Sequence, residues 1–140
     1  MKKLFRILSL ACLALLLFGL AGCSKYVSKY NAVGFVHSNS ARSAFMSFHQ
    51  FEGTMVFKLK APGGQAAQLD YSARLESGSA IVYLDAAGTK IELFSLSGGD
   101  EIAASAAQIN GEKTIYVIVE TDGRCENGEL YFDLNAPGGP

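Results

Sequence analysis

Apolar and polar residues alternate with a period of two over most of the chain between Ser43 and Asn135. In residues 69–76 every odd position is apolar or aromatic, and every even position is polar or charged. This alternation is typical of a β-strand with one buried and one solvated face. Short segments such as Glu52-Gly53 and Asn110-Gly111 interrupt the pattern, and the second favours a type I′ hairpin turn because both residues tolerate positive φ. The pattern predicts an all-β protein, an antiparallel β-sandwich of about eight strands, jelly-roll-like or immunoglobulin-like.

One of these segments also has helix propensity. Residues 102–107 have the sequence Ile-Ala-Ala-Ser-Ala-Ala, and alanine is the best helix former. The segment nevertheless fits the strand spacing, with Ile102, Ala104 and Ala106 at alternate positions. We therefore expect a strand there too.

The extent of the alternation sets the expected limits of the domain. We assign residues 43–135 to the sandwich and residues 136–140 to a tail. Residues 23–42 have no clear period and are rich in Ser, Lys, Asn and Tyr, so we assign them to a tether or arm. Within this arm, residues 31–40 form either a loose first strand or more of the tether.

Large apolar and aromatic side chains occupy several positions that should face away from the core. The alternation places eight residues inside, namely Ala80, Val82, Leu84, Ile115, Val117, Val119, Leu130 and Phe132. It then directs five residues outward, namely Ile81, Tyr83, Tyr116, Ile118 and Tyr131. Exposed apolar patches usually mark an interaction site, and tyrosine offers both a ring and a hydroxyl. These five residues form a candidate binding patch, unless residues 31–40 cover them or an inverted register buries them.

The first 22 residues follow a different pattern. Basic residues at positions 2, 3 and 6 precede an apolar run over residues 7–20, and two small residues follow it. This order is the pattern of a secretory signal peptide. The apolar run is shorter than the ~20 residues that a membrane-spanning helix needs. We therefore assign residues 1–22 to a signal peptide that is removed, rather than to a retained anchor helix.

The residue after the small pair indicates the kind of signal. Leu20-Ala21-Gly22-Cys23 resembles the lipobox of bacterial lipoproteins at all four motif positions. In that family the cysteine thiol is diacylglycerated, the peptide is cut before it, and the new amine is often acylated. The resemblance implies that Cys23 is the lipidated first residue of the mature chain, held at the extracytoplasmic face of a membrane. The alternative is an ordinary secreted protein with a chance cysteine at the cleavage site.

Charge is distributed unevenly over the mature chain. Loss of the signal removes three of the twelve basic residues and none of the thirteen acidic ones. Basic residues predominate up to residue 60, where Lys25 and Lys29 could gain from anionic headgroups, and acidic residues predominate beyond it. The acidic part argues against a nucleic-acid partner. Besides Cys23 only Cys125 remains, so we expect no intrachain disulfide.

The spacing of turns and apolar residues carries a second resemblance. It is clearest in Phe51-Glu52-Gly53-Thr54, Leu69-Asp70-Tyr71 and residues 75–79, 115–120 and 128–132. These segments are similar to small β-sandwich lipoproteins of Gram-positive bacteria, and more loosely to accessory sandwiches of secreted hydrolases. The resemblance implies the fold and a cell membrane as location, whereas Ser24 after the lipobox would also permit outer-membrane sorting. It implies no catalytic residue.

Motifs that carry chemistry are missing from the sequence. There is no P-loop, Rossmann glycine pattern, metalloprotease motif, Cys-x-x-Cys pair or nucleophile elbow, and we expect no cofactor. Asp122, Glu126 and Glu129 gather near one predicted turn and are candidate calcium ligands, although their spacing does not follow an EF-hand. Acidic turns are usually solvated, so we predict no metal site.

These observations favour a lipid-anchored, non-enzymatic β-sandwich that displays a recognition or structural surface, with a glycan or a protein as partner. The alternative is an accessory module or an enzyme acting on cell-envelope polysaccharide, which would need two carboxylates about 5 to 10 Å apart in a cleft. A third hypothesis is an assembly subunit whose edge strands pair with a partner. The sequence leaves the ligand and the oligomeric state open.

Overall fold

The structure is a computed structural model, and it describes residues 25–61, 67–109 and 114–135. The expected signal peptide, Cys23, the tail and the Asn110-Gly111 turn lie outside these residues. Within them, every regular element is a strand, and none is a helix that could span a membrane. The strands are β1 (Lys29–Val33), β2 (Val36–Asn39), β3 (Ser43–Lys60), β4 (Ala67–Ser77), β5 (Ser79–Asp85), β6 (Lys90–Ser97), β7 (Glu101–Ile109), β8 (Thr114–Thr121) and β9 (Cys125–Asn135). The expected all-β class is confirmed.

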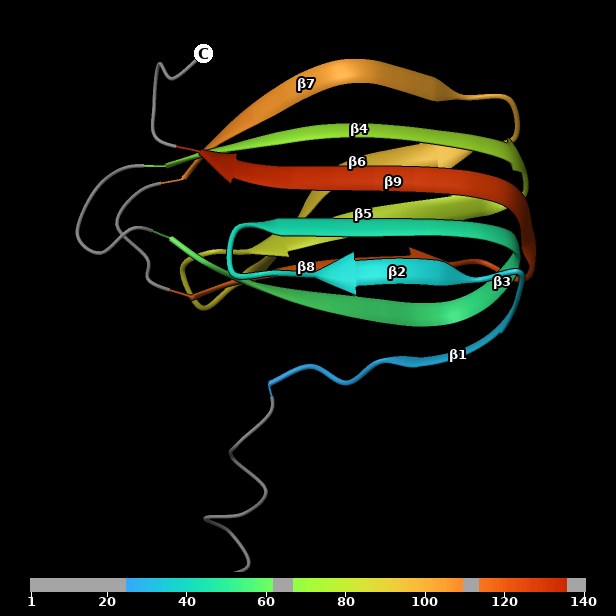
Figure 1. Ribbon diagram of the computed structural model, residues 1–140, viewed down its shortest axis with the longest axis horizontal. Coiled ribbons are helices and arrows are strands. Elements are labelled where there is room, and N and C mark those ends of the chain that lie inside the picture. Colours follow the sequence, from blue (N-terminus) through green and yellow to red (C-terminus); the bar gives the residue numbers. More distant parts are fainter. Residues whose placement is uncertain (1–24, 62–66, 110–113, 136–140) are drawn as a thin grey trace, which may run out of the picture.

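The strands form one antiparallel ladder that folds over into two packed layers (Figure 1). The hydrogen-bonded order is β6-β5-β8-β3-β9-β4-β7. Strand β3 belongs to both layers, because residues 43–51 pair with β9 and residues 54–60 pair with β8. We call β6, β5, β8 and residues 54–60 of β3 sheet I. Residues 43–51 of β3 with β9, β4 and β7 form sheet II, and the expected antiparallel sandwich is thereby confirmed.

The change of layer takes place at Gly53. Its φ is +128°, in a region of backbone conformation that residues other than glycine rarely adopt. A Cβ built at Gly53 would lie 2.3 Å from the carbonyl oxygen of Lys29 and 2.7 Å from the Cα of Tyr30. The sequence pattern suggested an interruption here. The structure shows instead one long strand that bends where β1 packs closely against it.

Residues 29–42, which the sequence pattern assigned to the arm, contribute directly to the sandwich. β1 pairs with residues 50–54 of β3, and β2 pairs with residues 44–47. Figure 1 shows β2 between the two halves of β3. The backbone amides of Val56, Lys58 and Lys60 donate to Ser28 Oγ at 2.8 Å, Asn39 Oδ1 at 3.1 Å and Ala41 O at 2.6 Å.

The expected boundary at residue 43 is therefore wrong. The segment before it provides hydrogen-bond acceptors for backbone donors on the edge of β3 opposite β8, and so continues the pairing of the strand. Residues 31–40 form strands rather than a cover for the candidate patch.

The core lies between the two sheets and contains all eight residues predicted to face inward. The ring of Phe132 in sheet II lies 6.3 Å from that of Phe57 in sheet I and 6.4 Å from that of Phe94. Tyr71 of β4 stacks on Phe94 of β6 at 4.9 Å between centroids. Aromatic contacts thus join the layers both at the centre and toward the side where β4 approaches β6. Alternation along the strands is in the predicted register.

Candidate functional site

The five residues of the predicted patch lie on two opposite surfaces. Ile81 and Tyr83 of β5 and Tyr116 and Ile118 of β8 point outward from sheet I, where Tyr83 pairs in register with Ile118. Tyr131 belongs to sheet II, because β9 pairs with β3 and β4, and its side chain points outward from that sheet. The single patch is therefore wrong. The turn between β8 and β9 carries the chain from one layer to the other, so equivalent positions on these strands face opposite sides.

The outer face of sheet I is partly covered by the segment just before β1. The ring of Tyr26 meets that of Tyr116 edge-on, with 5.3 Å between centroids. Lys90 Nζ lies 4.2 Å from the ring centroid of Tyr83, and Ile118 is only 1% exposed. One alternative was that residues 31–40 cover the patch. A segment does cover part of this face, but it consists of residues 25–28.

Asp85 holds this segment in place. The Asp85 carboxylate is 2% exposed and accepts hydrogen bonds from Lys25 Nζ at 2.7 Å, Tyr26 Oη at 2.5 Å and the Gly88 amide at 2.9 Å. Burial by itself would raise the pKa of Asp85, but the contacts with Lys25, Tyr26 and Gly88 outweigh it and lower that pKa. The same hydrogen bond, with burial, raises the pKa of Tyr26 to about 12. The ionised carboxylate and the neutral phenol therefore stabilise each other.

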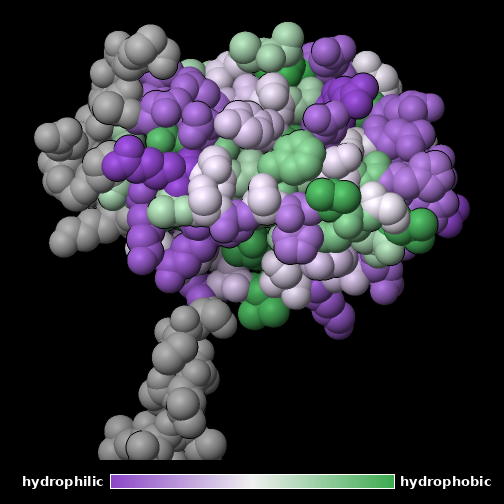
Figure 2. Space-filling model, viewed as in Figure 1, coloured by the Kyte–Doolittle hydropathy of each residue, from purple (hydrophilic) through white to green (hydrophobic). Residues whose placement is uncertain are grey.

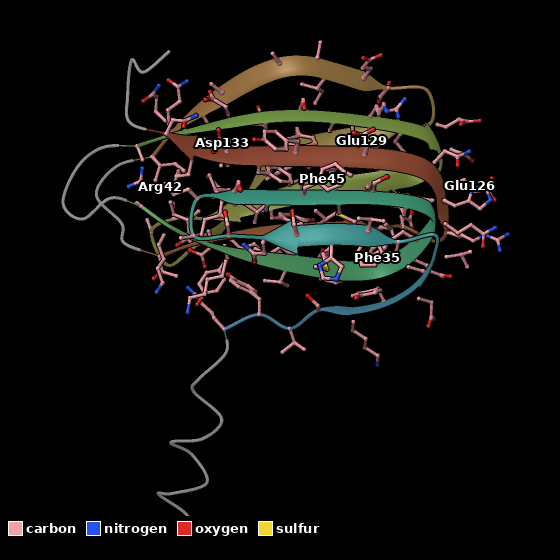
Figure 3. The ribbon with its side chains drawn as sticks, viewed as in Figure 1. Phe35, Arg42, Phe45, Glu126, Glu129 and Asp133 are labelled. Carbon is pink, nitrogen blue, oxygen red and sulfur yellow. The ribbon has the colours of Figure 1, made fainter. Side chains whose placement is uncertain are left out.

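The outer face of sheet II presents an exposed ring at its centre. Tyr131 is 43% exposed and lies between Phe45 of β3 and Ser72 of β4 in the register of the sheet. Its side chain borders two shallow hollows of about 180 and 240 Å³, whose other walls come from β4 and β7 and, in the smaller hollow, also from Glu129 of β9. Figure 3 shows Phe45, Glu129 and Asp133 on this side, along β3 and β9. We call this surface, centred on Tyr131, the Tyr131 face.

Amides and carboxylates are fixed beside Tyr131 by mutual hydrogen bonds. Gln68 Nε2 donates to Asp70 Oδ1 at 2.6 Å, and Asn135 Nδ2 donates to Asp70 Oδ2 at 2.6 Å and to Asp133 Oδ2 at 3.4 Å. Gln108 Nε2 donates to Gln68 Oε1 at 3.1 Å. The hydrogen bonds from Gln68, which has the larger effect, and from Asn135 lower the pKa of Asp70. We call these five residues the polar array, and it offers oriented donors and acceptors along one side of the ring.

Charged and polar groups also flank the other side of Tyr131. Arg74 donates to Glu129 Oε2 from Nη2 at 2.8 Å and from Nε at 3.2 Å. Beyond this pair lies a larger hollow of about 520 Å³, whose walls are Ser47, Phe48, residues 74–76 and 99–101, Asn127 and Gly128. Asn127 spans its rim, with Oδ1 2.9 Å from His49 Nδ1 and with Nδ2 donating to Glu76 at 2.9 Å. Figure 2 shows hydrophilic and apolar side chains mixed over this side of the molecule.

The candidate calcium ligands are not brought together. Glu129 accepts from Arg74, whereas Glu126 lies 4.0 Å from Arg124 Nε. Within residues 25–61, 67–109 and 114–135, no three His, Cys, Asp or Glu side chains are arranged to hold a metal ion. Asp122, Glu126 and Glu129 are thus separate surface acids, because the exit of the turn leads into a strand whose side chains diverge.

Sequence reasoning identified Tyr131 but missed its neighbours. The alternation over residues 69–76 places the polar residues of β4 on a solvated face, and it does not single out Asp133 or Asn135 at the end of β9. The signal that they form a site is their pairing, since Asp70 lies opposite Asp133 and Gln68 opposite Asn135. This pairing joins strands more than 60 positions apart in a register that composition does not reveal.

No protein-family model matches the chain, and no curated protein sequence does either. Among solved structures, it is similar to the Aeromonas hydrophila periplasmic inhibitor of g-type lysozyme, PliG, at 14% identity over 69% of this chain and 89% of that one, with a TM-score of 0.46. It is similar to a variant of CBM29-2, a family 29 carbohydrate-binding module, at 13% identity over 79% of this chain and 82% of that one, with a TM-score of 0.40. It is also similar to TmCBM61 in complex with β-1,4-galactotriose, at 13% identity over 80% of this chain and 82% of that one, with a TM-score of 0.37. These similarities are too low to transfer a ligand or an activity.

Proposed function

We propose that this chain is a lipid-anchored β-sandwich at the extracytoplasmic face of a cell membrane, and that it binds a neutral glycan without cleaving it. The observation that carries the proposal is the Tyr131 face, where an exposed ring adjoins the polar array. A sugar ring has an apolar C–H face and a rim of hydroxyl groups. An aromatic ring can cover the first, while fixed amides and carboxylates can bind the second.

Charge on the Tyr131 face favours a neutral ligand over an anionic polymer. The face carries Asp70, Glu129 and Asp133, and its nearest cation, Arg74, is already paired with Glu129. An anionic glycan would meet uncompensated carboxylates there. A neutral one can donate its hydroxyl hydrogens to them.

The alternative of a polysaccharide-cleaving enzyme has one specific observation in its favour. Asp70 and Asp133 face each other on adjacent strands, where the Cβ atoms of opposed residues lie about 5 Å apart. A general acid, however, needs a raised pKa, and the amides of Gln68 and Asn135 lower that of Asp70. Asn135 also donates to both carboxylates, which favours a binding role.

The Tyr131→Ala variant is expected to weaken glycan binding by about tenfold or more, equivalent to about 1.4 kcal/mol. Suitable probes are the neutral polymers β-1,4-glucan, xylan and galactan, each immobilised and titrated with the wild type and the variant. The matched control is Tyr83→Ala, which removes a tyrosine from the opposite face and should leave affinity unchanged. Equal weakening by both variants, or no binding to any probe, would contradict the proposal. Release of reducing ends by the wild type, abolished in Asp133→Asn, would favour the enzyme instead.

The Cys23→Ala variant is expected to move the protein from the membrane fraction to the soluble fraction. The physical reason is that the acyl chains on Cys23 are the proposed source of membrane affinity. Fractionation and immunoblotting measure the change, with Cys125→Ala as the control that leaves the lipobox intact. Unchanged membrane residence of Cys23→Ala would refute the anchor and leave the Tyr131 face untouched.

A further inference from the structure

The two outer faces of the sandwich carry opposite charge. Within residues 25–61, 67–109 and 114–135, register and alternation place five lysines and three acids on the outer face of sheet I and its covering segment, namely Lys25, Lys29, Lys58, Lys60, Lys90, Asp85, Glu92 and Glu120. They place one arginine and five acids on the outer face of sheet II, namely Arg74, Asp70, Glu76, Glu101, Glu129 and Asp133. The molecule is therefore electrically polarised across its thickness.

The excess positive charge on sheet I is available to a partner. Lys25 is paired with Asp85 and Lys90 with Glu120, each at 2.7 Å, so two of the three acids are neutralised. Lys29, Lys58 and Lys60 are exposed and make no salt bridge within the described part of the chain. Thr54 and Lys29 are register partners, and residues 54, 58 and 60 alternate with buried ones, so the three lysines share this face.

The beginning of the described chain lies on the same face. Lys25 and Tyr26 dock on Asp85, and Val27 beside them is 70% exposed. Cys23 precedes Lys25 by two residues, and two residues span at most about 7 Å. A lipid on Cys23 would therefore bring the bilayer surface close to the lysines, with Val27 as an apolar contact at the interface.

We propose that the outer face of sheet I rests on an anionic bilayer surface, so that the Tyr131 face points away from the membrane. This inference rests on the lipid anchor of the proposed function. Juxtamembrane lysines are attracted to anionic headgroups within about one Debye length, roughly 8 to 10 Å. The acidic face of sheet II is repelled by the same surface. Attraction on one side and repulsion on the other select one orientation of a tethered domain.

Site-specific labels on the full lipidated chain test this orientation. Ser95→Cys places a dye on the outer face of sheet I, and Ser47→Cys places the same dye on the outer face of sheet II, while Cys125 is buried and protected from labelling. Each protein is reconstituted into vesicles of phosphatidylcholine with or without phosphatidylglycerol, and quenching by headgroup spin labels is measured. With phosphatidylglycerol, the dye at residue 95 should be quenched at least about twofold more, since the layers lie about 10 Å apart.

Two charge-matched triple variants identify the cause. Lys29→Glu, Lys58→Glu and Lys60→Glu together should abolish the difference between the two labels. The control triple variant changes the net charge by the same amount and should preserve the difference between the two labels. It combines Arg42→Glu, Arg74→Glu and Arg124→Glu. Equal quenching at residues 95 and 47 in a chain that stays on the vesicles would overturn the orientation alone. A wild-type chain that binds neither vesicle would overturn the anchor and this inference with it, whereas glycan binding through Tyr131 would stand.

Discussion

Replacing Gly53 by alanine is expected to lower the free energy of unfolding by at least about 3 kcal/mol, because two effects act together. The φ of +128° belongs to a region that is strained for any residue with a Cβ. The new methyl group would also lie 2.3 Å from the backbone oxygen of Lys29, which cannot move without breaking the pairing of β1 with β3. Urea unfolding followed by circular dichroism measures the loss.

Gly123→Ala is the matched control for this variant. Gly123 also has a positive φ, +76°, but a Cβ there would meet no atom within 4 Å. We expect a cost of about 1 to 2 kcal/mol from backbone strain alone. If both variants lost the same stability, the close approach of β1 at Gly53 would have no energetic weight.

Replacing Asp85 by alanine is expected to cost about 3 kcal/mol, toward the lower end for breaking a buried ion pair, since Lys25 keeps access to water. It should also release residues 25–28 from sheet I, because Lys25 and Tyr26 both bind this carboxylate. Urea unfolding gives the first quantity. The rate of trypsin cleavage after Lys25 and Lys29 measures the release of the segment. We expect this rate to be about tenfold higher or more in the variant than in the wild type, if the free energy of releasing the segment is lower by at least about 1.4 kcal/mol.

Glu92→Ala serves as the control, because Glu92 is an exposed acid on the same face. It should change stability by no more than about 0.5 kcal/mol. Unchanged cleavage in Asp85→Ala would show that the segment is held by contacts other than this carboxylate.

The contribution of Asp85 should also depend on pH in a defined direction. Its folded-state pKa is lowered, so the stabilisation is complete above the ordinary carboxyl pKa of about 4 and is lost as pH falls through the folded value. The pKa of Tyr26 is raised to about 12, so its part is complete below the ordinary value of 10.0 and is lost as pH rises toward 12. The stability difference between wild type and Asp85→Asn should therefore be flat from about pH 5 to 9 and shrink on both sides.

The sequence predicts the strands of this protein better than their arrangement. Alternation identifies the inward residues of β5, β8 and β9 because that period is a local property of an extended chain. It assigns residues 102–107 to a strand despite their helix propensity, and they lie in β7. The assignment of Tyr131 to the same surface as Tyr116 was wrong, since the layer to which a strand belongs depends on its partners.

The same limit explains two other features that the sequence did not predict, the Asp70–Asp133 pair and the strands β1 and β2. Asp70 and Asp133 become neighbours only through the pairing of β4 with β9. Residues 29–39 lack a burial pattern, because β1 and β2 expose most of their side chains and are held by backbone pairing with β3. Hydrophobic periodicity cannot report backbone hydrogen bonds, nor the stacking of an exposed ring such as that of Tyr30 on the buried ring of Phe51.

The pairing of β3 also sets the order in which the domain can fold. Its partners β8 and β9 are the last two strands within the described residues, and β9 in turn separates β3 from β4. A nascent chain that ends before Cys125 therefore lacks the strand that joins β3 to β4 in sheet II. Such distant partners make loop closure costly and folding slow. Sheet II can therefore be completed only after β9 is available to join β3 to β4.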